Sequence, residues 1–404
     1  MMRSLFSGVS GLKNHQTQMD VIGNNIANVN TVAFKASRVT FEDILSQTLE
    51  GARSPVAGGP GGVNPTQIGL GMTISSVDTI FTAGSLQTTD NPTDLAIQGD
   101  GFFVVSDGNR TYYTRDGSFS MSADGSLVTS GGYRVQGWLA DSDGNIDTTQ
   151  ALQNVVIPVG TQMKPKATEN ILFEGNLDAN FADAKTWTTN TQVYDSLGNA
   201  HNLVIVFTKN GSNTWGWEAT LDGTQSGGTG TVTFGADGLV SAGGTGNLAF
   251  TIPGASALNI TVDFSRMTQF GGTPTAYVNL QDGYEAGSLE TVSVDSSGII
   301  TGIFTNGQSK SLGQIALATF PNPAGLTKMG GNLYQISNNS GAPNIGAANS
   351  GGRGSIAVGA LEMSNVDLAQ EFTNMIITQR GFQANSRVIT TSDEMLQDLI
   401  NIKR

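Results

Sequence analysis

Both ends of the chain carry apolar residues at every seventh position. The N-terminal set is Leu5, Leu12, Met19 and Ile26, with Val9 and Ile22 in a second stripe; the C-terminal set is Leu361, Leu368, Met375, Phe382, Ile389 and Leu396, with Phe372, Leu399 and Ile400 beside it. A seven-residue step is typical of helices that wind around other helices. We therefore predict a terminal helical coiled-coil domain formed by residues 1–30 and 356–404.

The C-terminal stripe is long, and its second line is imperfect. The C-terminal pattern covers roughly 45 residues, and a helix of that length would extend about 65–70 Å, which is too long to lie on one globular core. Polar residues interrupt the second line at Gln379, Asn385 and Ser392, where such residues lower stability but fix register. Two arrangements stay open: a hairpin between the two ends of one chain, or contacts with helices of other subunits.

Between the ends the pattern indicates β-structure. Asp-Gly pairs, which favour tight hairpin turns, begin at positions 100, 107, 116, 124, 143, 222, 237 and 282. Strand-like runs lie at 101–105, 202–208, 247–252, 259–264, 291–295 and 314–320. We see no helical period between about residue 70 and residue 340. The expected fold class is mainly β with α-helical coiled-coil termini.

Two Gly/Pro-rich stretches predict joints, GARSPVAGGPGGVNP (51–65) and SGAPNIGAANSGGRGS (340–355). They lead us to expect linkers, an inner β domain and an inserted outer β domain in a nested architecture with paired terminal helices. The predicted linkers are 31–70 and 340–355, the inner β domain is 71–151 with 285–339, and the outer domain is 152–284.

Composition narrows the classes of function. There are 20 Lys+Arg against 33 Asp+Glu, a net charge of −13, which argues against a nucleic-acid partner. The chain has no cysteine and only two histidines, His15 and His201, so thiolate metal sites and a three-histidine site are excluded. No apolar run reaches the ~18 residues of a membrane span, and the N-terminus lacks the pattern of a Sec signal peptide. We expect no cofactor, no metal and no membrane insertion.

Catalytic and calcium motifs are weak. DSDGNID (141–147) resembles half of a calcium loop, but Ile146 stands where glycine is required and Leu152 where glutamate is required. His201 lies near Asp195 and Ser196, yet DSLGN is typical of a turn before a strand, which favours a strand histidine over a triad base. We therefore predict that the chain is not an enzyme.

Asparagines crowd the end of the first predicted helix, in VIGNNIANVNTVAFK (21–35). Asparagine tolerates left-handed φ and bonds the backbone groups that a helix end leaves without partners. Because Gly23 also weakens the helix, we expect it to fray through 23–28 and the chain to turn there.

The whole string DVIGNNIANVNTVAFK resembles the signature of the rod and hook proteins of the bacterial flagellum. The likeness continues through SRVTFEDILSQTL (37–49), TDLAIQGDGFFVV (93–105), residues 112–138 and residues 359–404. The matching signature residues are Asn24, Asn25, Ile26, Ala27, Asn28, Phe34 and Lys35. One departure is Ala33, where the family usually has glycine; if that position needs positive φ, alanine is strained there.

Within the family, the module over 152–284 favours the hook type, because the distal rod protein lacks a large insertion. The segment VYDSLGNAHNLVIVF (193–207) is similar to the outer domain of hook proteins. The alternative is another axial component, such as a rod protein with an unusual insertion.

The resemblance implies a structural subunit that self-assembles into a hollow, flexible helical tube, which joins rod to filament and transmits torque as a universal joint. It implies an extracellular place in the flagellum after export through the flagellar type III apparatus. The implied partners are other copies of the chain, the distal rod protein, the hook-capping protein and the hook–filament junction protein. The stretch from Phe41 to Leu45 is similar to the motif that such substrates present to the export gate; a simple strand or helix face is the equal alternative. The terminal stripes are the predicted assembly residues.

Overall fold

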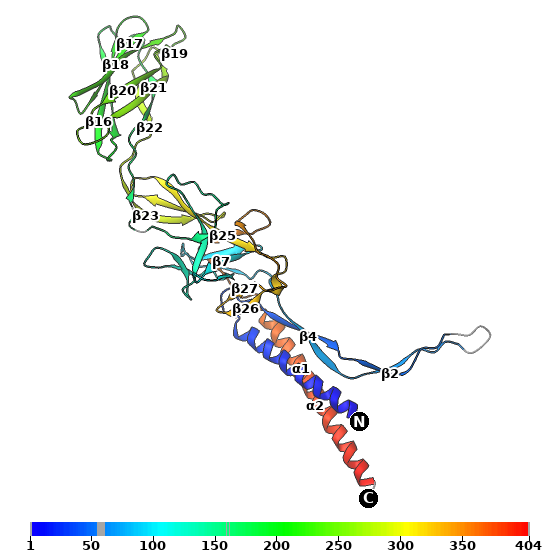
Figure 1. The fold of residues 1–404 in the computed structure, drawn as a ribbon. Coiled ribbons are helices and arrows are strands. Elements are labelled where there is room, and N and C mark those ends of the chain that lie inside the picture. Colours follow the sequence, from blue (N-terminus) through cyan, green and yellow to red (C-terminus); the bar gives the residue numbers. More distant parts are fainter. Residues whose placement is uncertain (1, 55–60, 159, 161, 403–404) are drawn as a thin grey trace. The chain divides into compact units, whose positions relative to one another are not determined.

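The computed structural model describes residues 2–54, 61–158, 160 and 162–402. Helices lie at the two ends of the chain and strands lie between them (Figure 1), so the expected fold class, mainly β with paired terminal helices, is confirmed. The chain divides into two compact units. The first contains residues 1–157, 293–301 and 311–404, and the second contains 158–292 and 302–310. In sequence, the second unit is therefore inserted into the first.

The terminal helices are α1 (Met2–Ala27) and α2 (Leu368–Ile402), and they pack against each other in antiparallel orientation (Figure 1). Ser4, near the start of α1, contacts Ser392, near the end of α2. Asn25, near the end of α1, contacts Glu371 in the first turn of α2. The hairpin within one chain is thus the arrangement that this molecule adopts.

The C-terminal helix is shorter than predicted, because it begins at Leu368 and not near residue 356. Asp367 caps it: its Oδ1 accepts hydrogen bonds from the backbone N–H groups of Ala369 and Gln370, at 2.9 and 3.3 Å. Leu361 lies in strand β30 (Ala360–Glu362), opposite Gln87 of β5 (Leu86–Thr88). Its place seven residues before Leu368 does not put it on the helix, so its predicted position in the helical stripe is wrong, and its role in assembly stays a prediction.

The core of the first unit is an antiparallel sheet in the order β25-β11-β7-β8-β27-β26. Its strands are β25 (Ser309–Thr319), β11 (Arg134–Leu139), β7 (Phe102–Ser106), β8 (Thr111–Thr114), β27 (Leu333–Gln335) and β26 (Thr327–Gly330), with β9 (Phe119–Met121), β10 (Leu127–Thr129) and β12 (Gln153–Asn154) beside it. Aromatic rings of Phe102, Phe320 and Tyr334 pack edge to face in its core. The predicted run at 101–105 is β7.

Most of the predicted first linker, 31–70, is a β-ribbon and not a joint. Strand β1 (Ser37–Asp43) pairs with β4 (Met72–Thr79), and β2 (Ser46–Glu50) pairs with β3 (Thr66–Gly69), so the two pairs form one extended hairpin (Figure 1). Val39, Thr40 and Phe41 are residues with high strand propensity and favour this strand. Part of the Gly/Pro-rich stretch, residues 55–60, lies outside the described residues.

The predicted second linker, 340–355, is also folded onto the body. Strand β28 (Asn344–Ala347) extends the sheet by pairing with β25, and β29 (Ser355–Val358) pairs with β6 (Leu95–Gln98). Glycine and proline mark the turns between these strands and not a flexible joint. Ser340, within this stretch, is fully buried.

The second unit has two sheets that share one apolar core. The first has the order β20-β21-β14-β22 and the second β15-β16-β17-β18-β19. The strands are β14 (Asn170–Asn176), β15 (Thr186–Tyr194), β16 (Ala200–Lys209), β17 (Thr214–Leu221), β18 (Gln225–Phe234), β19 (Val240–Ala242), β20 (Thr245–Phe250), β21 (Leu258–Thr268) and β22 (Tyr277–Gln281). Phe173, Phe207, Trp215 and Phe264 are buried between the sheets. The predicted runs at 202–208, 247–252 and 259–264 fall in β16, β20 and β21.

The unit boundaries differ from those predicted for the outer domain, 152–284. The second unit runs from 158 to 292 and takes in 302–310. The reason lies in pairing: β13 (Gln162–Met163) bonds to β23 (Gly287–Val294), and Lys166 forms a bridge with Tyr284. Part of the predicted inner segment, 285–339, therefore belongs to the inserted unit. The remaining strand is β24 (Ile299–Phe304).

His201 lies in β16, as predicted, and bonds two carboxylates. Its Nδ1 is 2.8 Å from Asp222 Oδ2, and its Nε2 is 3.5 Å from Asp195 Oδ2. The hydrogen bond to Asp222 raises the pKa of His201, with Asp195 adding to the rise and burial opposing it. The bond to His201 in turn lowers the pKa of Asp222. The hydrogen bond between His201 and Asp222 joins β16 to the turn after β17.

We predict that His201→Gln destabilises the second unit more at about pH 5 than at about pH 9. A raised histidine pKa adds stability that is complete below the unfolded value of about 6.5 and is lost as pH rises through the folded value. Urea unfolding followed by tryptophan fluorescence measures this, since Trp187, Trp215 and Trp217 lie in this unit. An equal loss of stability at both pH values would contradict it.

Candidate functional site

Small residues bring α1 and α2 into close contact. A Cβ on Gly11 would lie 2.6 Å from Asn385 Nδ2, and one on Gly8 would lie 3.1 Å from Ile389 Cγ1. On α2, a Cβ on Gly381 would lie 2.8 Å from His15 Nε2. Because contacts under 3.0 Å force a shift of the neighbouring atoms, these glycines permit the two helices to approach as they do.

Polar residues complete the seam between the helices. Ser4 Oγ lies 3.3 Å from Ser392 Oγ, and Thr378 and Ser392 are the buried residues of α2. Asn385 and Ser392, predicted as interruptions of an apolar line, lie inside the helix contact. The α1 side of the seam follows positions 4, 8, 11, 15 and 25, with the apolar Ile22 among them. Apart from Ile22 these residues are small or polar, and a search for apolar residues overlooks them.

The predicted apolar stripe lies beside this seam. Ile22 is buried, while the half-buried members are Leu5, Leu12, Met19, Ile26, Met375, Ile389 and Leu396. Leu368 and Phe382 are 40% and 38% exposed. The pairing of α1 with α2 therefore leaves much of the predicted assembly stripe uncovered.

Further large apolar side chains on the two helices are exposed. They are Met2, Phe6 and Val9 on α1, and Phe372, Ile376, Ile377, Val388, Met395, Leu399, Ile400 and Ile402 on α2. Exposed large apolar side chains in such number along two helices indicate an interaction surface. We call it the apolar flanks of the helix pair.

Asn25 ties the end of α1 to the start of β1. It is 1% exposed, its Nδ2 donates to Ser37 O at 2.8 Å, and its Oδ1 accepts from Ser37 N at 3.0 Å. Its Nδ2 also lies 3.3 Å from Glu371 Oε1. Burial raises the pKa of Glu371, and the bond from Asn25 opposes that rise. One asparagine thus joins α1, α2 and β1.

The other asparagines close the helix. Asn28 Nδ2 donates to the carbonyl oxygen of Asn24 at 2.9 Å, and Thr31 Oγ1 donates to Asn28 Oδ1 at 3.1 Å. The expected fraying from residue 23 is wrong, since α1 continues to Ala27, held by Asn25 and these bonds. Ala33 has φ +57°, so alanine occupies the left-handed conformation that glycine adopts without strain.

The signature residue Lys35 is fully buried in an ion cluster. Its Nζ lies 2.6 Å from Glu362 Oε1, and Arg115 Nη1 lies 3.4 Å from Glu362 Oε2. Burial lowers the pKa of Lys35 and that of Arg115, and Glu362 opposes both shifts. Phe34 precedes Lys35 in the chain, and Lys328 Nζ lies 5.3 Å from the centre of the Phe34 ring. The sequence alone assigned no role to Arg115 or Glu362, because their partners lie far away in the chain.

The residues of the possible export motif lie on the ribbon. Phe41 is in β1, opposite Ile74, and its ring packs edge to face with His15 at 6.0 Å. Leu45 is 63% exposed. In the folded chain Phe41 lies in β1, whereas Leu45 lies between β1 and β2. The role of this segment as an export motif stays a prediction.

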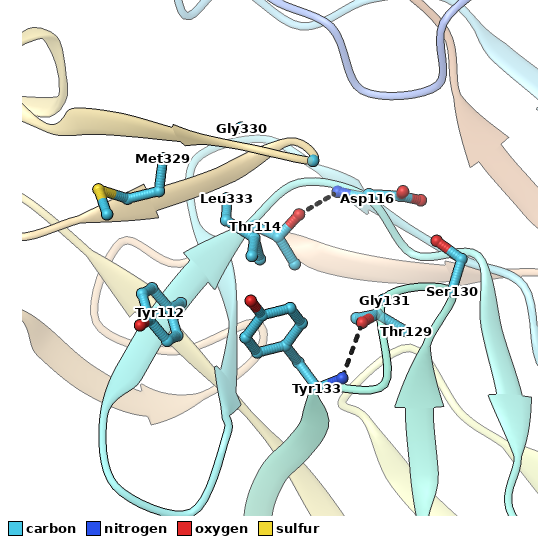
Figure 2. A pocket seen from close by; sticks show the side chains of 11 residues that line it. Tyr112, Thr114, Asp116, Thr129, Ser130, Gly131, Tyr133, Met329, Gly330 and Leu333 are labelled. Atoms are coloured by element: carbon cyan, nitrogen blue, oxygen red, sulfur yellow. Dashed lines mark hydrogen bonds between the residues drawn. The ribbon is translucent and has the colours of Figure 1, made fainter.

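A cavity of about 370 Å³ lies in the first unit. Figure 2 shows Tyr112, Tyr133 and Asp116 around it, with hydrogen bonds from Asp116 N to Thr114 Oγ1 and from Tyr133 N to Thr129 Oγ1. Its lining includes no histidine, cysteine, lysine or arginine.

Metal and membrane sites are likewise without support in the part of the chain that the structure describes. There, no group of three His, Asp or Glu side chains could hold a metal ion. Asp141 Oδ1, in the calcium-like segment, accepts from the backbone N–H groups of Asp143 and Asn145 and closes a turn. Neither described helix is long and apolar enough to cross a membrane.

Four family models match successive segments of the chain. Residues 5–35 match the flagella basal body rod protein, and 96–166 match the flagellar hook protein FlgE/F/G D1 domain. Residues 141–284 match the flagellar basal body protein FlaE D2 domain, and 357–402 match the flagellar basal body rod FlgEFG protein C-terminal region. All four describe axial proteins of the flagellum, and the D2 match covers most of the inserted unit.

Full-length relatives narrow the class. Flagellar hook protein FlgE of Borreliella burgdorferi is 42% identical over 443 residues, covering 100% of both chains. Flagellar basal-body rod protein FlgG of Bacillus subtilis is 36% identical over 407 residues, again covering 100% of both. A solved structure of Helicobacter pylori flagellar hook protein FlgE2 shares the fold, with TM-score 0.54 and 16% identity over 69% of this chain and 100% of that one. This chain belongs to the flagellar hook protein family and is a structural subunit of the hook.

We predict that Gly11→Leu separates the helix pair, whereas Gly23→Leu does not. A leucine at position 11 would overlap Asn385 and cost roughly 1–3 kcal/mol of packing, while a Cβ at Gly23 meets nothing within 4 Å. Leucine also favours helix over glycine by about 0.8–1 kcal/mol at either site. Thermal melting of the helical signal in far-UV circular dichroism measures both variants. Equal melting of the two would mean that the close contact is not formed.

Proposed function

We propose that the subunits assemble through the apolar flanks of the helix pair into a hollow helical tube. The observation that carries this proposal is the exposure of large apolar side chains along both helices after α1 and α2 have paired. Water is a poor environment for such a surface, and a second copy of the chain presents the same one. Head-to-tail contacts that do not close on themselves then build a tube of indefinite length.

The two helices differ in length, which favours contacts along the tube axis. α1 has 26 residues and α2 has 35, or about 39 and 52 Å at 1.5 Å per residue. Because Ser4 pairs with Ser392 and α1 begins at Met2, residues from about 395 to 402 extend past the start of α1. Leu399, Ile400 and Ile402 in this overhang are more than half exposed. A neighbouring copy would cover them.

Burial of the flanks would supply a large part of the free energy that assembly requires. Full burial of a large apolar side chain is worth about 1.5–3 kcal/mol. Covering the exposed half of several such residues on each subunit would therefore contribute several kcal/mol. That offsets a large part of the cost of immobilising a subunit, about 4–15 kcal/mol.

The remaining roles follow from family resemblance. We propose that the tube joins the rod to the filament and transmits torque through a bend as a universal joint. Its ends would meet the distal rod protein and the hook–filament junction protein, with the hook-capping protein at the growing tip. The chain would reach its extracellular place unfolded, through the flagellar type III apparatus, with Phe41 and Leu45 as a possible gate signal. The function would be structural and not catalytic.

We expect Phe382→Glu to block polymerisation while both β units stay folded. A charge in place of a half-exposed apolar ring removes part of the burial and adds desolvation, so the critical concentration should rise at least about tenfold. Sedimentation of polymer measures it, and near-UV circular dichroism checks the fold. Leu368→Glu should act likewise.

The matched control is Gln383→Glu, which adds the same charge to the adjacent exposed residue. It should polymerise close to the wild-type concentration. Normal polymerisation of Phe382→Glu would overturn the assembly role of the flanks.

A further inference from the structure

Three segments of the first unit, far apart in sequence, meet at the ion cluster. Lys35 follows α1, Arg115 follows β8, and Glu362 ends β30. The side chains of Lys35 and Glu362 are 0% exposed and that of Arg115 is 3% exposed. The cluster therefore links the N-terminal segment, the β body and the C-terminal segment at one buried point.

The C-terminal segment forms two strand pairings with the body. Strands β29 and β30 pair with β6 and β5, and Gly359 N and Met363 N donate to Asp94 O and Ser85 O. Glu362 Oε1 also accepts from Gly84 N at 2.9 Å. None of these bonds involves residues of the N-terminal segment.

The N-terminal segment, by contrast, rests on the C-terminal segment. Ala33 N donates to Glu362 O at 2.7 Å, and Ala36 N donates to Asn365 Oδ1 at 2.8 Å. Lys35 Nζ bonds Glu362 Oε1 and the carbonyl oxygen of Thr82. Body residues add further contacts, since Asn332 donates to Val32 O and Lys328 Nζ donates to Lys35 O at 3.2 Å. If the C-terminal segment detached, the backbone amides of Ala33 and Ala36 would lose their acceptors on Glu362 and Asn365.

The ion pairs show the same asymmetry between the N-terminal and C-terminal segments. Glu362 is the carboxylate that forms ion pairs with Lys35 and with Arg115 in the described part of the chain. Without Lys35, Glu362 keeps Arg115 as its partner. Without Glu362, two buried cations face each other, and Lys35 is the one whose segment can move into water.

We propose that the cluster is a conditional latch, in which the N-terminal segment docks stably on the body only after the C-terminal segment has placed Glu362. The order follows from the bonds: the C-terminal segment makes its site with the body, and the N-terminal segment completes it. The two terminal helices would then pair only on a subunit whose C-terminal segment is already in place. This inference does not depend on the polymer contacts.

Amide hydrogen exchange of the full-length monomer, read by mass spectrometry, tests the order. In Lys35→Met, exchange at Ala33 and Ala36 should rise about tenfold or more, while Gly359 and Met363 stay within about twofold of wild type. In Glu362→Gln, the N-terminal amides should rise at least as much as in Lys35→Met. The control Glu174→Gln removes the carboxylate of a solvent-exposed ion pair with Arg266 and should change neither segment.

Two results would overturn the latch. One is equal loss of protection at both segments in Lys35→Met, which would mean that the segments dock together. The other is retained protection at Ala33 and Ala36 in Glu362→Gln. If Glu362→Gln fails to fold, Lys35→Met alone decides, because it leaves the pair of Glu362 and Arg115 intact. Loss of polymerisation without either pattern would concern the flanks and not the latch.

Discussion

The close approach of α1 and α2 through Gly8, Gly11 and Gly381 governs how the rest of the chain is used. Because small residues form the contact, the two helices pair without burying most of their large apolar side chains against each other. Those side chains therefore remain on the flanks of the pair, where other subunits can reach them. A seam of leucines would have given a more stable helix pair, but it would have left less apolar surface for contacts with other subunits. The sequence thus separates pairing within a chain from contacts between chains.

The junction between the helices and the β body also holds the paired helices in place. Asn25 bonds both backbone groups of Ser37, and Lys35 enters the buried cluster with Glu362 and Arg115. Removing one partner from a buried ion pair costs about 3–5 kcal/mol, so the cluster is sensitive to any one loss. In this hook subunit, the cluster lies where the terminal helices join the rest of the chain. The inserted unit is stabilised separately, by its own aromatic core.

The sequence predicted long-range architecture better than local detail. Seven-residue periodicity located both helices, and Asp-Gly turns with apolar runs located strands such as β7, β16 and β21. Leu361 was misplaced because periodicity cannot show that Asp367 caps the helix. The stretch 340–355 contains folded strands although it is rich in glycine, because glycine and proline mark tight turns as readily as flexible joints.

Residues of the site divide in the same way. Lys35 and Asn25 could be singled out through a family signature, but their partners could not, since Glu362 and Glu371 follow hundreds of positions later. The small-residue seam was missed because only apolar residues were counted. A heptad count that includes glycine and serine would have found positions 4, 8 and 11 on one face of α1.

Hydroxyl-radical footprinting of monomer and polymer measures the central claim most directly, because it reports side-chain exposure. Met395 and Phe372, both about half exposed in the single chain, should be oxidised readily in the monomer and at least about fivefold more slowly in the polymer. Buried Phe173 of the inserted unit should react slowly in both. Equal reactivity of Met395 and Phe372 in monomer and polymer would show that neighbouring subunits do not cover the flanks, and assembly would have to proceed through another surface.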